Sequence, residues 1–215
     1  MNDFRNKLPL IFAVLFGVLI LYFGISKLIE LSGPMRWGAL MFIACYISWL
    51  FMESKVALTE SDKGKTSADK GTCEAYAAGR ALTLLSALAF PTVWTAPGAW
   101  MPIGFIVFIC GVFFRLIAIR TLGQFYSHRV RVMGHHQVVS SGPYQWVRHP
   151  AYTGMLIAHL GVVIFFFNWI TLLMWACVLL PSMILRINIE EKALFELAGY
   201  PEYAMNRKRL IPSVW

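Results

Sequence analysis

Long apolar runs separated by short polar intervals dominate this sequence and decide what it can fold into. A helix that crosses the hydrocarbon core of a bilayer needs about 20 predominantly apolar residues. Segments of roughly this kind are predicted to be about six membrane-spanning helices: 8–29, 37–52, 81–95, 100–119, 152–167 and 169–187. Only Asn168 separates the last two, which favours a tight helical hairpin that turns at this residue.

The composition agrees with an all-α, polytopic membrane helix bundle. Charged residues make up 14% of the 215 residues, whereas a soluble domain carries about a quarter. Strand-type alternation is absent, and no GxGxxG motif follows a strand pattern, so a Rossmann-type nucleotide-binding sheet is not expected. A ligand site in such a chain has to be built from helix ends and loops.

The positive charge is distributed unevenly along the chain and predicts its orientation. The formal net charge is +8, and lysine and arginine gather before the first apolar run, within 53–80, within 120–151 and in the tail. The connections on the other side contain little more than Arg36. The positive-inside rule therefore predicts cytoplasmic N- and C-termini. No basic stripe with interleaved aromatic residues is present, so nucleic-acid binding is not predicted.

Polar residues that could bind a ligand or take part in a reaction gather before the predicted hairpin. Pro150 is suited to the first turn of a helix, where unpaired N–H groups and a partial positive charge favour an anion. Arg148 and His149 come immediately before it. Together they could hold a carboxylate or phosphate beside the membrane. The alternative is that both are ordinary interfacial residues that extend toward lipid headgroups.

A second polar group lies where the last apolar run ends. Arg186 and Glu190 are four residues apart, so they share one face of a helix and can interact. The predicted topology places them on the same side as Arg148 and His149. Ionisable residues at the end of a membrane span indicate a functional site, although a simple ion pair within the helix is the alternative.

The order of these motifs resembles the isoprenylcysteine carboxyl methyltransferase family, from about residue 117 to the C-terminus. The pattern comprises His136, Gly142-Pro143-Tyr144, Arg148-His149-Pro150, Tyr152, Gly154, Arg186, Glu190-Glu191, Gly199, Tyr203 and Arg209-Leu210-Ile211-Pro212. The resemblance implies an integral membrane methyltransferase that uses S-adenosyl-L-methionine. It also implies two regions: N-terminal transmembrane helices over 1–119, and a catalytic region over 120–215 with a cofactor pocket on the cytoplasmic side.

The resemblance further implies roles for individual residues. The family positions that contact the cofactor match His136, Gln137, Val138, Val139, Tyr144, His149, Pro150, Ala151, Tyr152 and Glu190. Arg148 joins them because its guanidinium could hold the carboxylate of the cofactor. Arg186 matches the arginine associated with the methyl acceptor. Relatives often carry serine at the position of Ala151, so a hydroxyl contact is absent there.

The acceptor is expected to be lipophilic and to enter from the bilayer, but the sequence leaves its reactive group open. An isoprenylcysteine carboxylate would be oriented by Arg186 and would need no base. A small thiol or amine would have to lose a proton, and Glu190 or Glu191 would then be the candidate base. An isoprenoid acid is a further alternative.

The sequence leaves two other functions open beside this hypothesis. Sterol-reductase-like membrane enzymes carry a related C-terminal pattern and use NADPH, so a membrane reductase is the main alternative. A non-catalytic scaffold or small transporter is another. His128, His135 and His136 have no carboxylate at ligand spacing, so no metal site is predicted. His159 falls inside an apolar run and is predicted to be a hydrogen-bonded packing residue.

Overall fold

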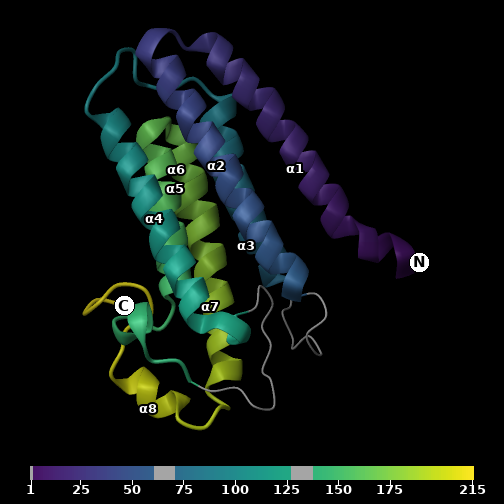
Figure 1. Ribbon diagram of the computed structural model, residues 1–215, viewed down its shortest axis with the longest axis vertical. Coiled ribbons are helices and arrows are strands. Elements are labelled where there is room, and N and C mark those ends of the chain that lie inside the picture. Colours follow the sequence, from purple (N-terminus) through teal and green to yellow (C-terminus); the bar gives the residue numbers. More distant parts are fainter. Residues whose placement is uncertain (1, 61–70, 127–137) are drawn as a thin grey trace.

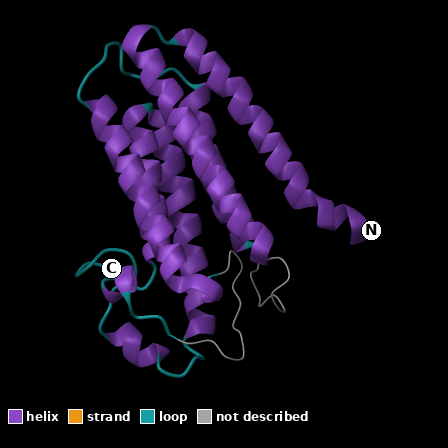
Figure 2. Cartoon of the chain, in the orientation of Figure 1, coloured by secondary structure: helices purple, strands orange, loops and turns teal. Residues whose placement is uncertain are grey.

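The computed structural model describes residues 2–60, 71–126 and 138–215 of the chain. All the regular elements in these ranges are helices (Figure 2), and most of them lie side by side in an elongated bundle (Figure 1). The extended backbone in these ranges forms one isolated bridge, between Val147 and Lys208. The prediction of an all-α bundle is therefore confirmed.

Five long helices precede a final interrupted one. They are α1 (Asn2–Glu30), α2 (Gly33–Glu60), α3 (Thr72–Ala89), α4 (Trp100–Leu122) and α5 (Pro150–Phe165). The last long helix starts as α6 (Trp169–Leu173), passes through the π-helical segment η3 (Met174–Leu179) and ends as α7 (Leu180–Leu194). Two short 3-10 helices, η1 (Gly123–Phe125) and η2 (Gly142–Gln145), and the short helix α8 (Tyr200–Met205) lie outside the bundle proper.

Three stretches among the described residues are long and apolar enough to cross a membrane: Gly33–Glu53, Trp100–Phe125 and Trp169–Leu194. Helix α5 is apolar but shorter. The predicted count of six spans therefore stays a prediction. The boundary predicted for 81–95 is wrong, because α3 ends at Ala89, where Phe90 takes an extended conformation ahead of Pro91. Proline disfavours helical backbone in the residue before it.

The polar interval predicted between the second and third spans is also shorter than expected. Helix α2 continues to Glu60, and α3 begins at Thr72. Glu53 and Arg80 therefore lie on helices rather than in or beside a loop. Both side chains turn inward and are largely buried, which places two charges inside the bundle.

Helices α4 and α5 approach each other closely because glycines line their contact. A Cβ atom added at Gly111 would lie 2.2 Å from the backbone nitrogen of Ala158, and one added at Gly154 would lie 2.6 Å from that of Arg115. Small residues allow membrane helices to pack backbone against backbone. The close approach brings Arg115 against the first turn of α5.

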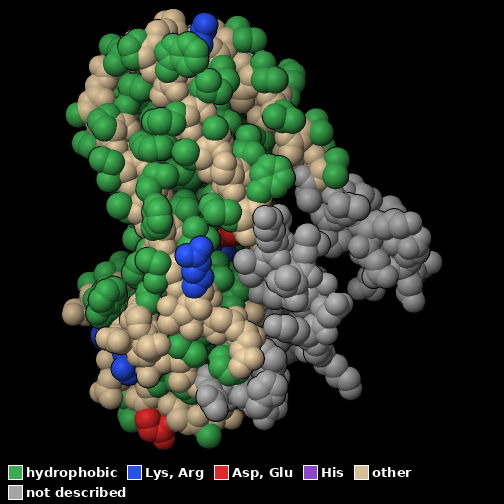
Figure 3. Space-filling model, in the orientation of Figure 1, with side chains coloured by type: hydrophobic (Ala, Val, Ile, Leu, Met, Phe, Trp, Pro, Cys, Tyr) green, Lys and Arg blue, Asp and Glu red, His purple; other side chains and the backbone are tan. Residues whose placement is uncertain are grey.

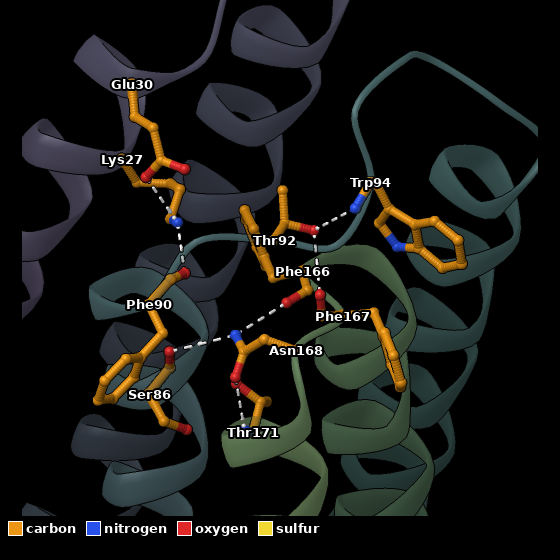
Figure 4. Close-up of polar contacts among 10 residues, drawn as sticks. All are labelled: Lys27, Glu30, Ser86, Phe90, Thr92, Trp94, Phe166, Phe167, Asn168 and Thr171. Carbon is orange, nitrogen blue, oxygen red and sulfur yellow. Dashed lines mark hydrogen bonds and ion pairs between the residues drawn. The ribbon is translucent and has the colours of Figure 1, made fainter.

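The end of the bundle that holds the α1–α2, α3–α4 and α5–α6 connections is called the far end (Figure 1). The hairpin turns here at Asn168, as predicted: its side-chain oxygen accepts a hydrogen bond from the Thr171 amide at 2.8 Å. Figure 4 shows the surrounding contacts. The buried Lys27 donates to the Phe90 carbonyl at 2.6 Å, and Asn168 donates to the Ser86 carbonyl at 3.5 Å. These bonds tie α1, α3 and α6 together.

His159 lies in the middle of α5 and is fully buried. Its Nδ1 atom is 3.0 Å from the Met155 carbonyl, which can only accept, so Nδ1 carries the hydrogen. The other ring nitrogen then accepts from the Tyr46 hydroxyl at 3.1 Å. The prediction of a hydrogen-bonded packing histidine is confirmed.

Candidate functional site

The opposite end of the bundle, here called the site end, contains those residues singled out by the sequence that the structure describes. His149 precedes α5 and Pro150 opens it, as predicted. The C-terminal tail fixes this segment, because the amides of Arg148 and His149 donate to the carbonyls of Lys208 and Arg209 at 2.8 and 3.0 Å. The tail therefore holds the start of α5 in place.

Arg186 and Glu190 meet through a tyrosine from another helix. The Tyr152 hydroxyl accepts a hydrogen bond from Arg186 Nε at 2.8 Å and donates one to Glu190 Oε2 at 2.7 Å. Arg186 is 2% exposed. This arrangement, called the Tyr152 bridge, joins α5 to α7 and brings together three residues that the sequence predicted to share a site.

Glu191, the next residue, contacts three basic side chains. Its Oε1 atom lies 3.2 Å from Arg148 Nη1 and 3.1 Å from His149 Nε2, and its Oε2 atom lies 2.8 Å from Arg209 Nη2. Arg148 and His149 therefore face a carboxylate of the chain itself. The sequence predicts Glu191 only as an alternative base, because spacing does not show which of two adjacent glutamates faces His149.

A third polar group comes from the N-terminal half and was not anticipated as part of the site. Glu53 of α2 pairs with Arg115 of α4 and with Arg80 of α3, the latter at 3.1 Å. Arg115 also donates to the Ala151 carbonyl at 3.0 Å and to the Tyr126 hydroxyl at 3.2 Å. An arginine within a long apolar run was the signal that could have revealed it.

Aromatic contacts connect this group, called the Glu53 group (Glu53, Arg80 and Arg115), to the Tyr152 bridge. The rings of Tyr76 and Tyr152 meet edge to face with centroids 5.6 Å apart. The guanidinium of Arg80 lies over the Tyr76 ring at 5.7 Å. Helices α2 and α3 thus border the same polar layer as α5 and α7.

Three of the remaining predicted residues lie in the apolar cluster of Tyr144 or pack against it. Ala151 packs in one apolar cluster with Tyr144, and the half-buried Val138 and Val139 pack against that cluster. Pro150 is also buried. His136 and Gln137 lie outside the described residues, as do His128 and His135. No cluster of three or more metal-ligating side chains occurs among the residues that the structure describes.

The phenols of Tyr144 in η2 and Tyr203 in α8 stay protonated at neutral pH. Burial raises the pKa of the Tyr144 phenol, and the Glu190 carboxylate raises it further. Burial raises the pKa of Tyr203 to about 12, although Arg207 and Arg148 oppose the shift. Tyr203 accordingly remains protonated and donates to the Tyr144 carbonyl at 2.8 Å. The site end thus offers both carboxylates and basic groups, which suits a ligand that carries both signs of charge.

Comparison with known proteins identifies relatives of this region. Residues 103–196 match the isoprenylcysteine carboxyl methyltransferase (ICMT) family. Protein-S-isoprenylcysteine O-methyltransferase B of Arabidopsis thaliana is 34% identical over 115 residues, which cover 52% of this chain and 58% of the relative. The Saccharomyces cerevisiae protein-S-isoprenylcysteine O-methyltransferase is 35% identical over 105 residues, covering 47% and 44%. The chain thus spans about half the length of these curated relatives.

The fold also matches a solved structure. The eukaryotic intramembrane Ras methyltransferase ICMT superposes with a TM-score of 0.50 at 26% sequence identity, over 93% of this chain and 73% of that one. The similarity therefore reaches into the N-terminal helices, which the family match does not cover.

Proposed function

Because residues 103–196 match the isoprenylcysteine carboxyl methyltransferase family, we propose that this chain is a member of that family and an integral membrane enzyme that transfers a methyl group from S-adenosylmethionine to a lipophilic acceptor. The observation that carries the proposal is the Tyr152 bridge. It holds a carboxylate and a guanidinium from α7 against α5, at the end of the bundle where the family motifs converge.

The described residues fit a cofactor with an ammonium, a carboxylate and an adenine. Glu190 would pair with the ammonium, and Tyr144 and Tyr152 would border the adenine. Arg148 and His149 would lie on the carboxylate side, where Arg148 Nε is buried and has no hydrogen-bond partner among the described residues. Further contacts are proposed from His136, Gln137, Val138, Val139, Pro150 and Ala151.

S-adenosylmethionine supplies a methyl group already activated on a sulfonium. The protein then has to align the acceptor and exclude water, because an in-line displacement needs little covalent help. We propose that Arg186 orients an acceptor carboxylate, which is already ionised at neutral pH and needs no base. For a thiol or amine acceptor, Glu190 would accept the departing proton.

We also propose a topology and a division of the chain. On the face drawn in Figure 3, hydrophobic side chains cover the part toward the far end, while most of the visible lysine and arginine side chains lie toward the site end. This asymmetry supports cytoplasmic N- and C-termini. Residues 120–215 would contain the cofactor pocket. Residues 1–119 would anchor the enzyme and add the Glu53 group to the wall of the site.

The proposal is tested by methyl transfer in purified, reconstituted protein. Labelled S-adenosylmethionine is incubated with N-acetyl-S-farnesylcysteine, and label in the lipid extract is counted. Wild type is expected to transfer label, and Arg186→Ala to lose at least about tenfold of the rate, since a hydrogen bond to a charged group contributes about 1.5–3 kcal/mol. No label in any extract, with small thiols and amines also supplied, would refute the enzyme assignment.

The reductase alternative has no support from the comparisons. Thermal melting still separates the two activities, because a ligand stabilises the fold that binds it. S-adenosylhomocysteine is expected to raise the melting temperature, and NADPH to leave it unchanged. If alanine at Arg186, Glu190 and His149 changed neither melting nor transfer, a non-catalytic role would replace the proposal.

A further inference from the structure

A cavity opens on the other side of α7 from the Tyr152 bridge. Its volume is about 570 Å³, and its lining consists of Asn188, Glu191, Lys192, Phe195 and Arg209. The lining residues of α7 recur every three or four positions, which is the spacing of one helix face. Arg186 and Glu190 lie on the other face of the same helix. The cavity therefore opens on the face of α7 opposite the Tyr152 bridge, while the Oε1 atom of its Glu191 carboxylate contacts Arg148 and His149.

The cavity lies at the depth where a membrane-spanning helix leaves the bilayer. The apolar stretch Trp169–Leu194 ends within its wall. One to two turns earlier, the exposed side chains of Pro181 and Leu185 continue toward the bilayer on the same side of the helix. A molecule that occupies the cavity can therefore extend an apolar portion along α7. A phospholipid has this form, with a polar headgroup above acyl chains.

The charge of the lining favours an anion. Lys192 is exposed, and its ammonium has no partner among the described residues. Arg209 pairs with Glu191, but that carboxylate also faces Arg148 and His149, so basic groups outnumber the acid. Guanidinium and ammonium groups bind phosphate well. The amide of Asn188 adds neutral donors to the same wall.

The C-terminal tail beside the cavity carries apolar side chains that are not buried by the protein. It turns back on itself, with the amides of Leu210 and Ile211 donating to the Trp215 carbonyl at 2.8 and 2.9 Å. Ile211 and Val214 are 54% and 69% exposed, and the Trp215 ring lies against Arg209. Exposed apolar residues beside arginine and tryptophan are typical of a segment at the membrane interface.

We propose that this cavity binds the headgroup of an anionic phospholipid. Lys192 and Arg209 bind its phosphate and acidic groups, and the tail residues Ile211, Val214 and Trp215 lie among the neighbouring lipids. The site needs neither cofactor nor methyl acceptor, so it stands apart from the proposed enzyme activity.

Native mass spectrometry of the full chain released from nanodiscs tests the proposal. The nanodiscs contain equal amounts of phosphatidylserine and phosphatidylcholine with identical acyl chains, and no cofactor or acceptor. Wild type is expected to retain one phosphatidylserine in preference to phosphatidylcholine. Lys192→Gln should lower this preference at least about tenfold, which corresponds to the loss of a direct hydrogen bond between charged groups. Lys208→Gln is the matched control: it removes the same charge from an exposed position outside the cavity.

Three results would overturn the inference. The first is equal retention of the two lipids by wild type. The second is an equal loss of preference in Lys192→Gln and Lys208→Gln, which would indicate general surface charge rather than a site. The third is displacement of phosphatidylserine by inorganic phosphate at millimolar concentration, which would assign the cavity to a free anion. None of these results bears on methyl transfer, which is measured separately.

Discussion

The two ends of the bundle both bury polar side chains, but they use them differently. At the far end, Lys27 and Asn168 donate to backbone carbonyls of neighbouring segments (Figure 4), and the Trp94 indole donates to the Ile164 carbonyl. At the site end, the polar side chains bond mainly to one another, as in the Tyr152 bridge and the cluster around Glu191. The far end therefore satisfies backbone groups that chain turns leave unpaired, whereas the site end maintains charged groups that the backbone does not require.

This difference separates polar side chains that stabilise the fold from polar side chains that are available for function. Backbone carbonyls at a helix end need a donor wherever a chain turns inside a membrane. Pairs of buried carboxylates and guanidinium groups have no such requirement and are costly to bury. Their accumulation at one end, on helices from both halves of the chain, is what the proposed catalytic role explains.

The largest effect is expected from Glu53→Ala. The substitution leaves Arg115, which is 1% exposed, without its carboxylate. Removing one partner of a buried ion pair lowers the free energy of unfolding by about 3–5 kcal/mol. The protein should therefore unfold at a markedly lower denaturant concentration in mixed micelles. Replacement of Glu53, Arg80 and Arg115 together by apolar residues is the control and should restore much of the loss. An unchanged midpoint for Glu53→Ala would show that the Glu53 group does not hold the helices together.

A smaller effect, on activity rather than stability, is expected from Tyr152→Phe. The ring keeps its contact with Tyr76, but the hydroxyl that joins Arg186 to Glu190 is lost. Hydrogen bonds to charged groups contribute about 1.5–3 kcal/mol, so kcat/KM should fall about tenfold to a hundredfold. The measurement is the label-transfer assay. Wild-type activity in a folded Tyr152→Phe protein would remove the bridge from the mechanism.

The smallest effect is expected at the far end. Asn168→Ala removes the N-cap of α6, and such a loss costs about 0.5–2 kcal/mol. The unfolding midpoint should therefore decrease slightly, while the rate of methyl transfer by the folded protein stays at the wild-type level. A loss of activity as large as that of Tyr152→Phe would mean that the two ends do not differ in the way their contacts indicate.

Local features of the fold were predictable because each depends on neighbouring residues. A lone Asn168 between two apolar runs predicted the hairpin, and Pro150 predicted the start of α5. The end of α3 was predicted too late, because hydropathy continues past Ala89 while Pro91 ends the helix. The π-helical segment Met174–Leu179 has no sequence signal of this kind, since it changes the backbone register without changing composition.

The candidate site was predictable only where a family motif or a helical spacing marks it. Arg186 and Glu190 were paired by spacing, but the phenol between them comes from another helix. Glu53 and Arg115 are 62 positions apart, so no local pattern connects them. The separation of Glu190 from Glu191 into two different clusters likewise depends on which helices pack against each face of α7.

Binding of S-adenosylhomocysteine to the purified protein tests the central claim most directly. Isothermal titration should show saturable binding to wild type, an affinity at least about tenfold weaker for Glu190→Gln because a charge-assisted hydrogen bond is lost, and an unchanged affinity for Asn168→Ala. Equal affinities in all three proteins, or no saturable binding at millimolar ligand, would contradict the assignment of the site end as a cofactor pocket.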